Sequence, residues 1–203
     1  TVYDSAYTAK GIALYHSLVA HHNAEPFTLH VLALDMETYW LLDSMHLDHV
    51  IVTPITLFEK VMSLAAVRAN RSWTEYCWTC ASQFMEYIFK TYAIPQLTYL
   101  DADLYFFGDP SVIYEEMGDC SIAIVPHRFD KHCAKSVING VYNVGWLTIV
   151  YDMAGLSCLT KWAEQCRAWC YLRNEDGKFA DQGYLDEWPI EYGYDLSVIA
   201  NIG

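Results

Sequence analysis

Hydrophobic residues recur along this chain with two spacings, one typical of strands and the other typical of helices. Short apolar runs predict strands over residues 1–4, 27–34, 49–53, 97–100, 121–125 and 145–150. Helical spacing predicts helices over residues 6–22, 37–45, 57–69, 72–95 and 152–173, with a short helix after residues 108–110. Strands that alternate with helices predict an α/β fold with a mostly parallel sheet and helices on both of its faces.

The helix expected before residue 97 carries clear signals at both of its ends. Ser72 and Glu75 have the spacing of a capping box, and Pro95 cannot continue a helix. The apolar run 97–100 then follows as a buried strand that delivers Asp101. Because ligands of open α/β sheets bind beyond the carboxyl ends of the strands, residues that follow each strand are candidates for a common site.

Composition indicates one globular domain. The 203 residues are 54% hydrophobic and 18% charged, which is typical of a folded protein rather than a disordered one. There is no internal repeat, low-complexity tract or linker, so we expect a single domain over residues 1–203. The net charge of −13 argues against nucleic acid or an anionic membrane surface as the main partner. No feature of the pattern predicts the oligomeric state.

The cysteines and the hydrophobic windows indicate the compartment. Seven scattered cysteines favour free thiols in a reducing environment over a disulfide framework. Cys77 and Cys80 have C-x-x-C spacing, but they lie inside a helical pattern with no preceding strand, which favours core thiols over a redox or metal site. No window resembles a signal peptide or a membrane span. We therefore expect a cytoplasmic protein, with a peripheral position at the inner face of the cell membrane as an alternative.

Polar residues follow several of the predicted strands. Asp4 and Asp35 each come directly after a strand, and either could instead serve as a helix N-cap. The segment 126–132, with the sequence "PHRFDKH", follows another strand and gathers cations in an otherwise acidic chain. An exposed loop is an equally good interpretation of that segment.

Asp101 and Asp103 stand one residue apart between the apolar segments "LTYL" and "LYFF". With one residue between them, both carboxylates can face one hard cation, and Mg²⁺ and Mn²⁺ commonly share their oxygen ligands with substrate phosphates. A solvated turn is the alternative, but the apolar flanks argue against it. A phosphatase of the haloacid dehalogenase type also carries Asp-x-Asp after a strand, with the first Asp as the nucleophile. That pattern has Thr or Val where this chain has Tyr105, and it usually opens its domain.

The segment "TYLDADLYFFGDP" resembles the Asp-x-Asp segment of GT-A glycosyltransferases, particularly glycosyltransferase family 8 and related bacterial enzymes. The resemblance extends over most of the chain. "TVYDSAYTAKGIALYHSL" is similar to the family's opening strand and helix, and "FTLHVLALD" to its second strand. "GVYNVGWLTIV" resembles the Asn-x-Gly segment, and "FADQGYLDEWP" the Asp-Gln-x-x-Leu segment. Each motif is weak alone, and five in the family's order imply a single Rossmann-like GT-A domain.

The resemblance implies an enzyme that transfers a sugar from a nucleotide-diphosphate donor, expected to be a UDP-sugar, to a glycan or lipid-linked sugar acceptor, with retention. It implies that Asp101 and Asp103 hold Mn²⁺ or Mg²⁺, with Asp101 also near the ribose. The positions that match the family's donor-binding residues are Val2, Tyr3, Asp4 and Tyr7 beside the base, Asn143 facing the sugar, and Gly145, where the backbone can approach closely.

Two further sets of residues take their implied roles from the same resemblance. Asp181 and Gln182 match the acid-amide pair beside the reacting carbon, where they would stabilise an oxocarbenium-like centre. His127 and Arg128 would then lie near the acceptor or the diphosphate. The alternative is a purely structural role for these residues: Asn143 would be a turn residue, and Asp181 would be a helix N-cap.

The chain departs from the family's pattern at two places. Family members often carry an Arg in the helix before the Asp-x-Asp strand, where this chain has "TCASQFMEY". They also carry a later segment with a His that completes the metal site and a Lys that reaches the phosphates, and we expect this chain to be truncated before it. A non-catalytic protein of the same fold that binds a nucleotide or a glycan is therefore the competing hypothesis.

Overall fold

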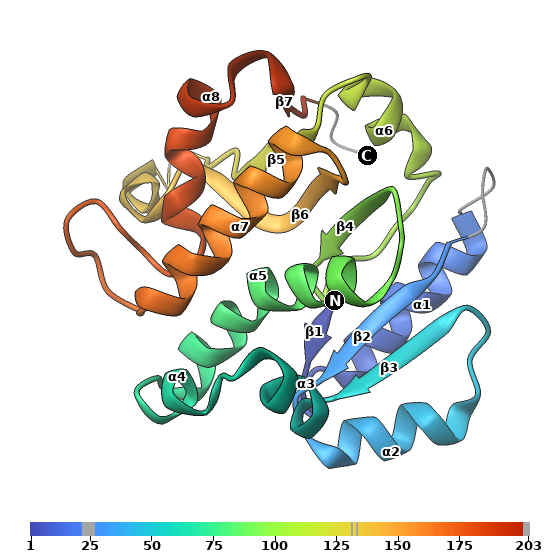
Figure 1. Cartoon of the computed structure of the whole chain (residues 1–203). Coiled ribbons are helices and arrows are strands. Elements are labelled where there is room, and N and C mark those ends of the chain that lie inside the picture. The colour runs from blue at the N-terminus through green and yellow to red at the C-terminus, as the bar shows by residue number, and fades with distance from the viewer. Residues whose placement is uncertain (22–26, 131, 133, 201–203) are drawn as a thin grey trace.

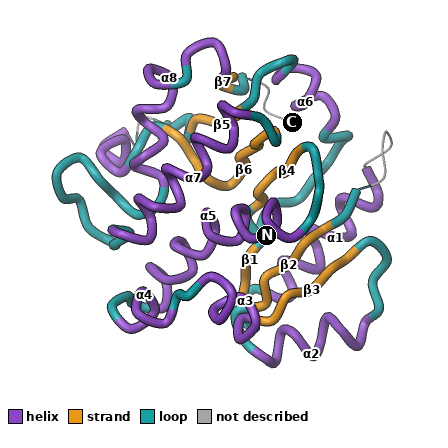
Figure 2. The backbone as a smooth tube through the Cα atoms, in the orientation of Figure 1, coloured by secondary structure: helices purple, strands orange, loops and turns teal. Residues whose placement is uncertain are grey.

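The computed structural model describes residues 1–21, 27–130, 132 and 134–200. Within them the chain folds into two sheets with helices packed around them, so the predicted α/β fold is confirmed (Figure 1). The backbone trace in Figure 2 shows the strands gathered in the middle of the molecule and the helices around them. The predicted helix over residues 6–22 ends at His21 in the structure, and His22 lies outside the described residues.

The first sheet is parallel and contains β1 (Val2–Tyr3), β2 (Leu29–Ala33) and β3 (Val50–Pro54), in that order. Every residue of β2 is buried. Its side chains alternate between two cores, because successive residues of a strand point to opposite faces. Val31 packs with α1 (Thr8–His21) and α2 (Met36–Met45), whereas Leu32 packs with α3 (Ile55–Met62) and α5 (Trp73–Thr91). Helices therefore cover both faces of this sheet, as the sequence predicts.

The second sheet is mixed. It contains β4 (Gln96–Leu100), β6 (Tyr142–Val150), β5 (Ile122–Pro126) and β7 (Leu196–Val198), in that order. The central strand β6 runs antiparallel to both β4 and β5, whereas β7 is parallel to β5. This sheet packs against α5 and α7 (Met153–Ala168) around Trp162, Leu147 and Ile149.

Helix α5 joins the two halves of the fold. Its buried residues enter both cores: Phe84 packs under the first sheet, and Met85 packs under the second. The predicted capping box is present, since Ser72 accepts from the backbone N–H of Glu75 and Glu75 accepts from the backbone N–H of Ser72. The helix therefore starts at a fixed point, close to the carboxyl ends of β1 and β4.

Two predicted helices are wrong in their extent. The helix expected over residues 57–69 is broken into α3 and α4 (Ala65–Ala69), because Ser63 adopts a left-handed conformation with a φ of 55°. The helix expected over residues 152–173 ends at Ala168, and the backbone of Trp169 is extended. The hydroxyl of Tyr184 donates to the Trp169 carbonyl at 2.7 Å, which satisfies a backbone acceptor just past the helix end.

The strand expected over residues 145–150 begins three residues earlier, at Tyr142. Asn143 and Gly145 therefore lie inside β6, and the turn alternative for Asn143 is wrong. The remaining elements are short: α6 (Ser111–Met117), α8 (Trp188–Glu191) and three 3-10 helices over Ala134–Asn139, Gln182–Glu187 and Gly193–Asp195.

Cys77, Cys80, Cys120, Cys158, Cys166 and Cys170 are all free thiols, as the sequence predicts for the cysteines in the described residues. None of the helices in that part of the chain is both long and apolar enough to cross a membrane.

Candidate functional site

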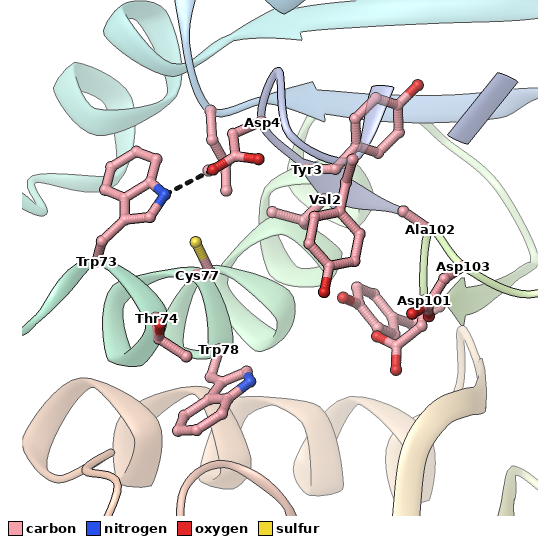
Figure 3. A pocket seen from close by; sticks show the side chains of 13 residues that line it. Val2, Tyr3, Asp4, Trp73, Thr74, Cys77, Trp78, Asp101, Ala102 and Asp103 are labelled. Atoms are coloured by element: carbon pink, nitrogen blue, oxygen red, sulfur yellow. Dashed lines mark hydrogen bonds between the residues drawn. The ribbon is translucent and has the colours of Figure 1, made fainter. Parts of the chain in front are cut away.

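A pocket of about 280 Å³ opens where the carboxyl ends of β1 and β4 meet the first turns of α5 (Figure 3). Its wall is formed by Val2, Tyr3, Asp4, Tyr7, Leu34, Trp73, Thr74, Cys77, Trp78, Tyr99, Asp101, Ala102 and Asp103. The structure thus brings residues 2–7 together with the Asp-x-Asp pair, although nearly a hundred residues separate them in sequence. In Figure 3, Asp4 and Trp73 lie at one end of the pocket and Asp101 and Asp103 at the other.

A larger hollow of about 790 Å³ lies between β2 and β4, lined in part by Leu29, Leu97 and Trp146. None of the acidic residues singled out from the sequence lines it. The smaller pocket is therefore the better candidate site, because polar and aromatic groups converge there at strand ends.

Asp101 and Asp103 form the acidic end of the pocket. Burial, with the charge of Asp103 as the next cause, raises the pKa of Asp101 above its usual value. The backbone N–H of Asp101 donates to the Gly145 carbonyl at 3.0 Å, which ties the carboxyl end of β4 to β6. The Lys10 ammonium lies 3.4 Å from Asp103 Oδ2 and is the cation that the structure places against this carboxylate.

The acid pair meets part of what a metal site requires. A carboxylate pair in which the charge of Asp103 helps to raise the pKa of Asp101 suits a hard divalent cation, which takes oxygen ligands and fills its other positions with phosphate or water. Over the residues that the structure describes, no group of three or more His, Cys, Asp or Glu side chains is arranged to hold a metal ion. In this part of the chain, Asp101 and Asp103 would therefore hold such an ion without a third His, Cys, Asp or Glu ligand.

Asn143 and Gly145 lie directly beside Asp101. The amide oxygen of Asn143 accepts from the backbone N–H of Gly145, two residues along the same strand. A Cβ atom at position 145 would stand 3.2 Å from Asp101 Oδ2 and 2.9 Å from Asn143 Oδ1. With glycine at this position, the strand can approach these two polar side chains without moving them.

Asp181 belongs to the same electrostatic cluster. It is only 5% exposed, and burial, followed by the charge of Asp101, raises its pKa to about 7. Asp181 occupies the N-cap position of the 3-10 helix that follows it, as the alternative interpretation predicts, but its side chain makes no capping hydrogen bond there. Its carbonyl accepts from Trp162 Nε1 at 2.9 Å, which fixes the backbone at this point.

Gln182, His127 and Arg128 lie farther along the rim of the second sheet and do not line the pocket. Gln182 Nε2 donates to the Asn139 carbonyl at 2.7 Å. His127 Nδ1 is 3.3 Å from the amide nitrogen of Asn143, so His127 touches the residue that flanks Asp101. Arg128 donates to the carbonyls of Ile199 and Ala200, which fastens the end of β7. Lys131, in the same predicted segment, lies outside the described residues.

Asp4 closes a turn before α1 rather than capping the helix. Its Oδ1 accepts from the backbone N–H of Ala6 at 3.1 Å, and α1 begins at Thr8. Asp35, by contrast, is the predicted N-cap: it accepts from the backbone N–H of Thr38 at 2.7 Å and also from Ser5 at 2.8 Å. Burial is the largest single effect and raises the pKa of Asp35, but the hydrogen bonds from Thr38 and Ser5 together outweigh it, so this pKa lies below its usual value.

Several pocket residues were not found from the sequence. Trp73, Thr74 and Trp78 come from the first turns of α5, and Tyr99 comes from the strand before the acid pair. Cys77 was assigned to the core but lines the pocket, and burial raises its pKa to about 12. Because burial raises the pKa of Cys80 as well, neither thiol of the C-x-x-C pair is a thiolate near neutral pH. The sequence does carry one signal that could have identified three of these pocket residues: Trp73, Thr74 and Trp78 fall at the start of a capped helix after a polar loop.

Comparison with known proteins places the fold. No protein-family model matches the chain. Two Bacillus subtilis (strain 168) proteins that carry the name "uncharacterized" are similar to it: YfnF, 31% identical over 92% of this chain and 63% of its own length, and YfnD, 26% identical over 100% of this chain and 65% of its own length. The chain thus spans just under two thirds of each.

Among solved structures, the glycosyltransferase GlyE of Streptococcus pneumoniae TIGR4 has a similar fold, with a TM-score of 0.55 and 16% sequence identity. The match covers 98% of this chain and 44% of GlyE. At this level of identity the likeness concerns the fold alone. The chain therefore has a glycosyltransferase-like α/β fold.

Proposed function

We propose that this chain is a metal-dependent glycosyltransferase that takes a sugar from a nucleoside-diphosphate donor, a UDP-sugar, and transfers it to a glycan or lipid-linked sugar acceptor. One observation carries the proposal: in a glycosyltransferase-like fold, a single pocket joins the aromatic and polar residues 2–7 to the acid pair Asp101 and Asp103. A nucleobase, which stacks through its flat faces and forms hydrogen bonds at its edge, and an anionic diphosphate need two different kinds of surface, and the two ends of the pocket provide them.

The two ends of the pocket suit the two ends of such a donor. Val2 and Tyr7 offer apolar and aromatic surface to the base, and Asp4 offers an acceptor for a ring N–H. The Tyr3 ring is buried against Gly11 of α1 and supports this wall from the core. Asp101 and Asp103 would hold Mn²⁺ or Mg²⁺, which supplies positive charge to the diphosphate leaving group. Without such charge, two carboxylates and a net charge of −13 would repel the donor.

The cluster around Asp101 supports a place for the donor sugar. Asn143 and Asp181 both lie near Asp101, so their polar groups would face the part of the donor that follows the diphosphate. A carboxyl with a pKa near 7 can be ionised once a cation sits nearby, because the cation favours the charged form. Asp181 would then stabilise positive charge that develops at the reacting carbon, with retention of configuration as in family 8. Gln182 is proposed to assist from the same turn.

The test is donor-dependent release of nucleoside diphosphate by the full chain. A panel of UDP-, GDP-, ADP- and CDP-sugars is incubated with Mn²⁺ or Mg²⁺, and free nucleoside diphosphate is measured with and without candidate acceptors. We expect release with a UDP-sugar and its loss in Asp103→Asn, which keeps the size of the side chain and removes its charge. Asp43→Asn, at an exposed position on α2, is the matched control and should leave release unchanged.

The competing function, a protein that binds a nucleotide without transferring a sugar, rests on the absence of a three-residue metal group in the described part of the chain. It predicts binding of UDP or a UDP-sugar with no release of nucleoside diphosphate by any donor. If no nucleotide binds and none is released, both functions are wrong.

A further inference from the structure

Trp73 and Asp4 form a hydrogen bond across the pocket between residues that are 69 positions apart. Trp73 Nε1 donates to Asp4 Oδ2 at 2.7 Å, as the dashed line in Figure 3 shows. Both residues line the pocket, so the bond forms part of its wall. A hydrogen bond to an ionised carboxylate is among the stronger side-chain contacts, which makes this one able to fix a rotamer.

The second carboxylate oxygen of Asp4 is also held. Oδ1 accepts from the backbone N–H of Ala6 at 3.1 Å, and the neighbouring Ser5 N–H donates to Asp35 at 2.8 Å. The turn over residues 4–7 is therefore tied to α2 as well as to its own carboxylate. Asp4 cannot rotate freely, and its remaining lone pairs have a fixed direction.

The indole ring of Trp73 is also held in place by neighbouring side chains. The Arg68 guanidinium lies 4.5 Å from the Trp73 ring and 4.9 Å from the Tyr76 ring, and it pairs with Glu59 at 3.4 Å. The capping box at Ser72 and Glu75 fixes the backbone one residue before Trp73. The ring is thus held by stacking on one side and by its N–H at the edge.

We propose that Trp73 is a positioning residue that keeps Asp4 as an oriented hydrogen-bond acceptor, and through it determines which nucleobase the pocket accepts. The inference rests on the proposed function, since it concerns the base end of the same site. A fixed acceptor favours a base with a ring N–H on its pairing edge, as uracil has at N3. It disfavours cytosine, whose N3 is an acceptor, because two acceptors would face each other without a proton.

The test compares the dissociation constants of UDP and CDP, measured by calorimetry in the presence of Mn²⁺. These two probes share the ribose and the diphosphate, so their ratio reports on the base alone. We expect the wild type to prefer UDP by about tenfold or more, the worth of one charge-assisted hydrogen bond. Trp73→Phe, which keeps a ring and removes the N–H, should bring the ratio to within about threefold. Trp40→Phe, an exposed residue of α2, should keep the wild-type ratio.

A double variant separates positioning from a loss of packing. If Trp73 acts through Asp4, Trp73→Phe adds nothing to the change in ratio that Asp4→Asn produces alone. If circular dichroism shows that Trp73→Phe does not fold, the test uses the indole N–H resonance of Trp73 instead, measured by nuclear magnetic resonance in the wild type and in Asp4→Asn. That resonance should shift in Asp4→Asn, with the UDP preference lost in the same variant.

Three results would overturn the inference. An unchanged UDP-to-CDP ratio in folded Trp73→Phe overturns the inference and leaves the proposed function standing. Equal binding of UDP and CDP by the wild type has the same consequence. An indole resonance that is insensitive to Asp4→Asn has the same effect. Failure of the wild type to bind any nucleoside diphosphate removes the proposed function and the inference together, so the two kinds of failure are distinguishable.

Discussion

Lys10 Nζ lies 3.4 Å from Asp103 Oδ2, and the same ammonium sits 4.1 Å from the centroid of the Tyr7 ring. Lys10 is therefore the counter-ion of Asp103. It contacts one residue at each end of the pocket, Asp103 at the acidic end and Tyr7 at the other. Both side chains of the ion pair are about half exposed, at 51% and 48%, so the pair is weak and exchangeable. A divalent cation that binds Asp103 must displace this ammonium or share the carboxylate with it.

Removing Lys10 should strengthen metal binding. We expect Lys10→Met to bind Mn²⁺ more tightly than the wild type, by up to about fivefold, since an exposed ion pair is worth about 0.2–1 kcal/mol. Electron paramagnetic resonance of free Mn²⁺ during a titration measures this affinity. Lys90→Met, which removes the exposed Lys90–Glu86 pair of α5, is the control and should change nothing. Weaker Mn²⁺ binding by Lys10→Met would show that Lys10 supports the site instead of competing for it.

Gly145→Ala should damage the site and the fold together. The new Cβ would stand 2.9 Å from Asn143 Oδ1 and 3.2 Å from Asp101 Oδ2, so both side chains must move. We expect a loss of about 1–3 kcal/mol in the free energy of unfolding, measured with urea, and weaker Mn²⁺ binding. Gly108→Ala is the matched control, because a Cβ there meets no atom within 4 Å. Equal behaviour of the two variants would contradict the close approach of β6 to Asp101.

The buried carboxyl of Asp181 should make stability depend on pH in the metal-free protein. Its pKa is raised from 3.8 to about 7, so between these values the folded state holds a proton that the unfolded state has lost. Stability contributed by this group is complete below pH 4 and is lost as pH rises toward 7. A shift of this size corresponds to at most about 4 kcal/mol, at about 1.4 kcal/mol for each pKa unit.

Asp181→Asn should remove that dependence. Urea unfolding in EDTA should find the variant more stable than the wild type at pH 8, with the difference shrinking at pH 4.5. Asp186→Asn, in the same 3-10 helix, is a poor control because Asp186 accepts from Val141; Asp176→Asn, at an exposed position, is the better one. A wild type whose stability is flat between pH 4.5 and 8 would contradict the buried state of Asp181.

The sequence patterns correctly predict those structural features that depend on neighbouring residues. The Ser72–Glu75 box, the Asp35 cap and the strand that delivers Asp101 all depend on neighbouring residues, and the structure has each of them. The break at Ser63 and the early end of α7 depend on contacts with distant parts of the chain. Tyr184, which holds the carbonyl just past the end of α7, follows that helix by sixteen residues, so helical spacing alone could not reveal the stop.

The acidic residues of the site could be predicted from the sequence, but the aromatic residues that line its pocket could not. Asp4 and Asp101 stand out because polar residues after strands share one rim of the sheet. Asp181 stands out only through the resemblance of the segment "FADQGYLDEWP" to a glycosyltransferase motif. Trp73 does not stand out, since its bond to Asp4 depends on how α5 crosses the end of β1. The burial of Asp181 was also hidden, because an N-cap residue is normally exposed and the sequence leaves that role open as an alternative.

The proposed function requires that the pocket bind a nucleoside diphosphate through a divalent cation on Asp101 and Asp103. Titration calorimetry of UDP, in saturating Mn²⁺ and again in EDTA, tests it most directly. We expect binding with Mn²⁺ that weakens at least about tenfold in EDTA, because the unscreened carboxylates then repel the diphosphate. Binding should also weaken in Asp103→Asn, because the cation loses one of its two carboxylate ligands. UDP binding that is the same with Mn²⁺, with EDTA and in Asp103→Asn would contradict it.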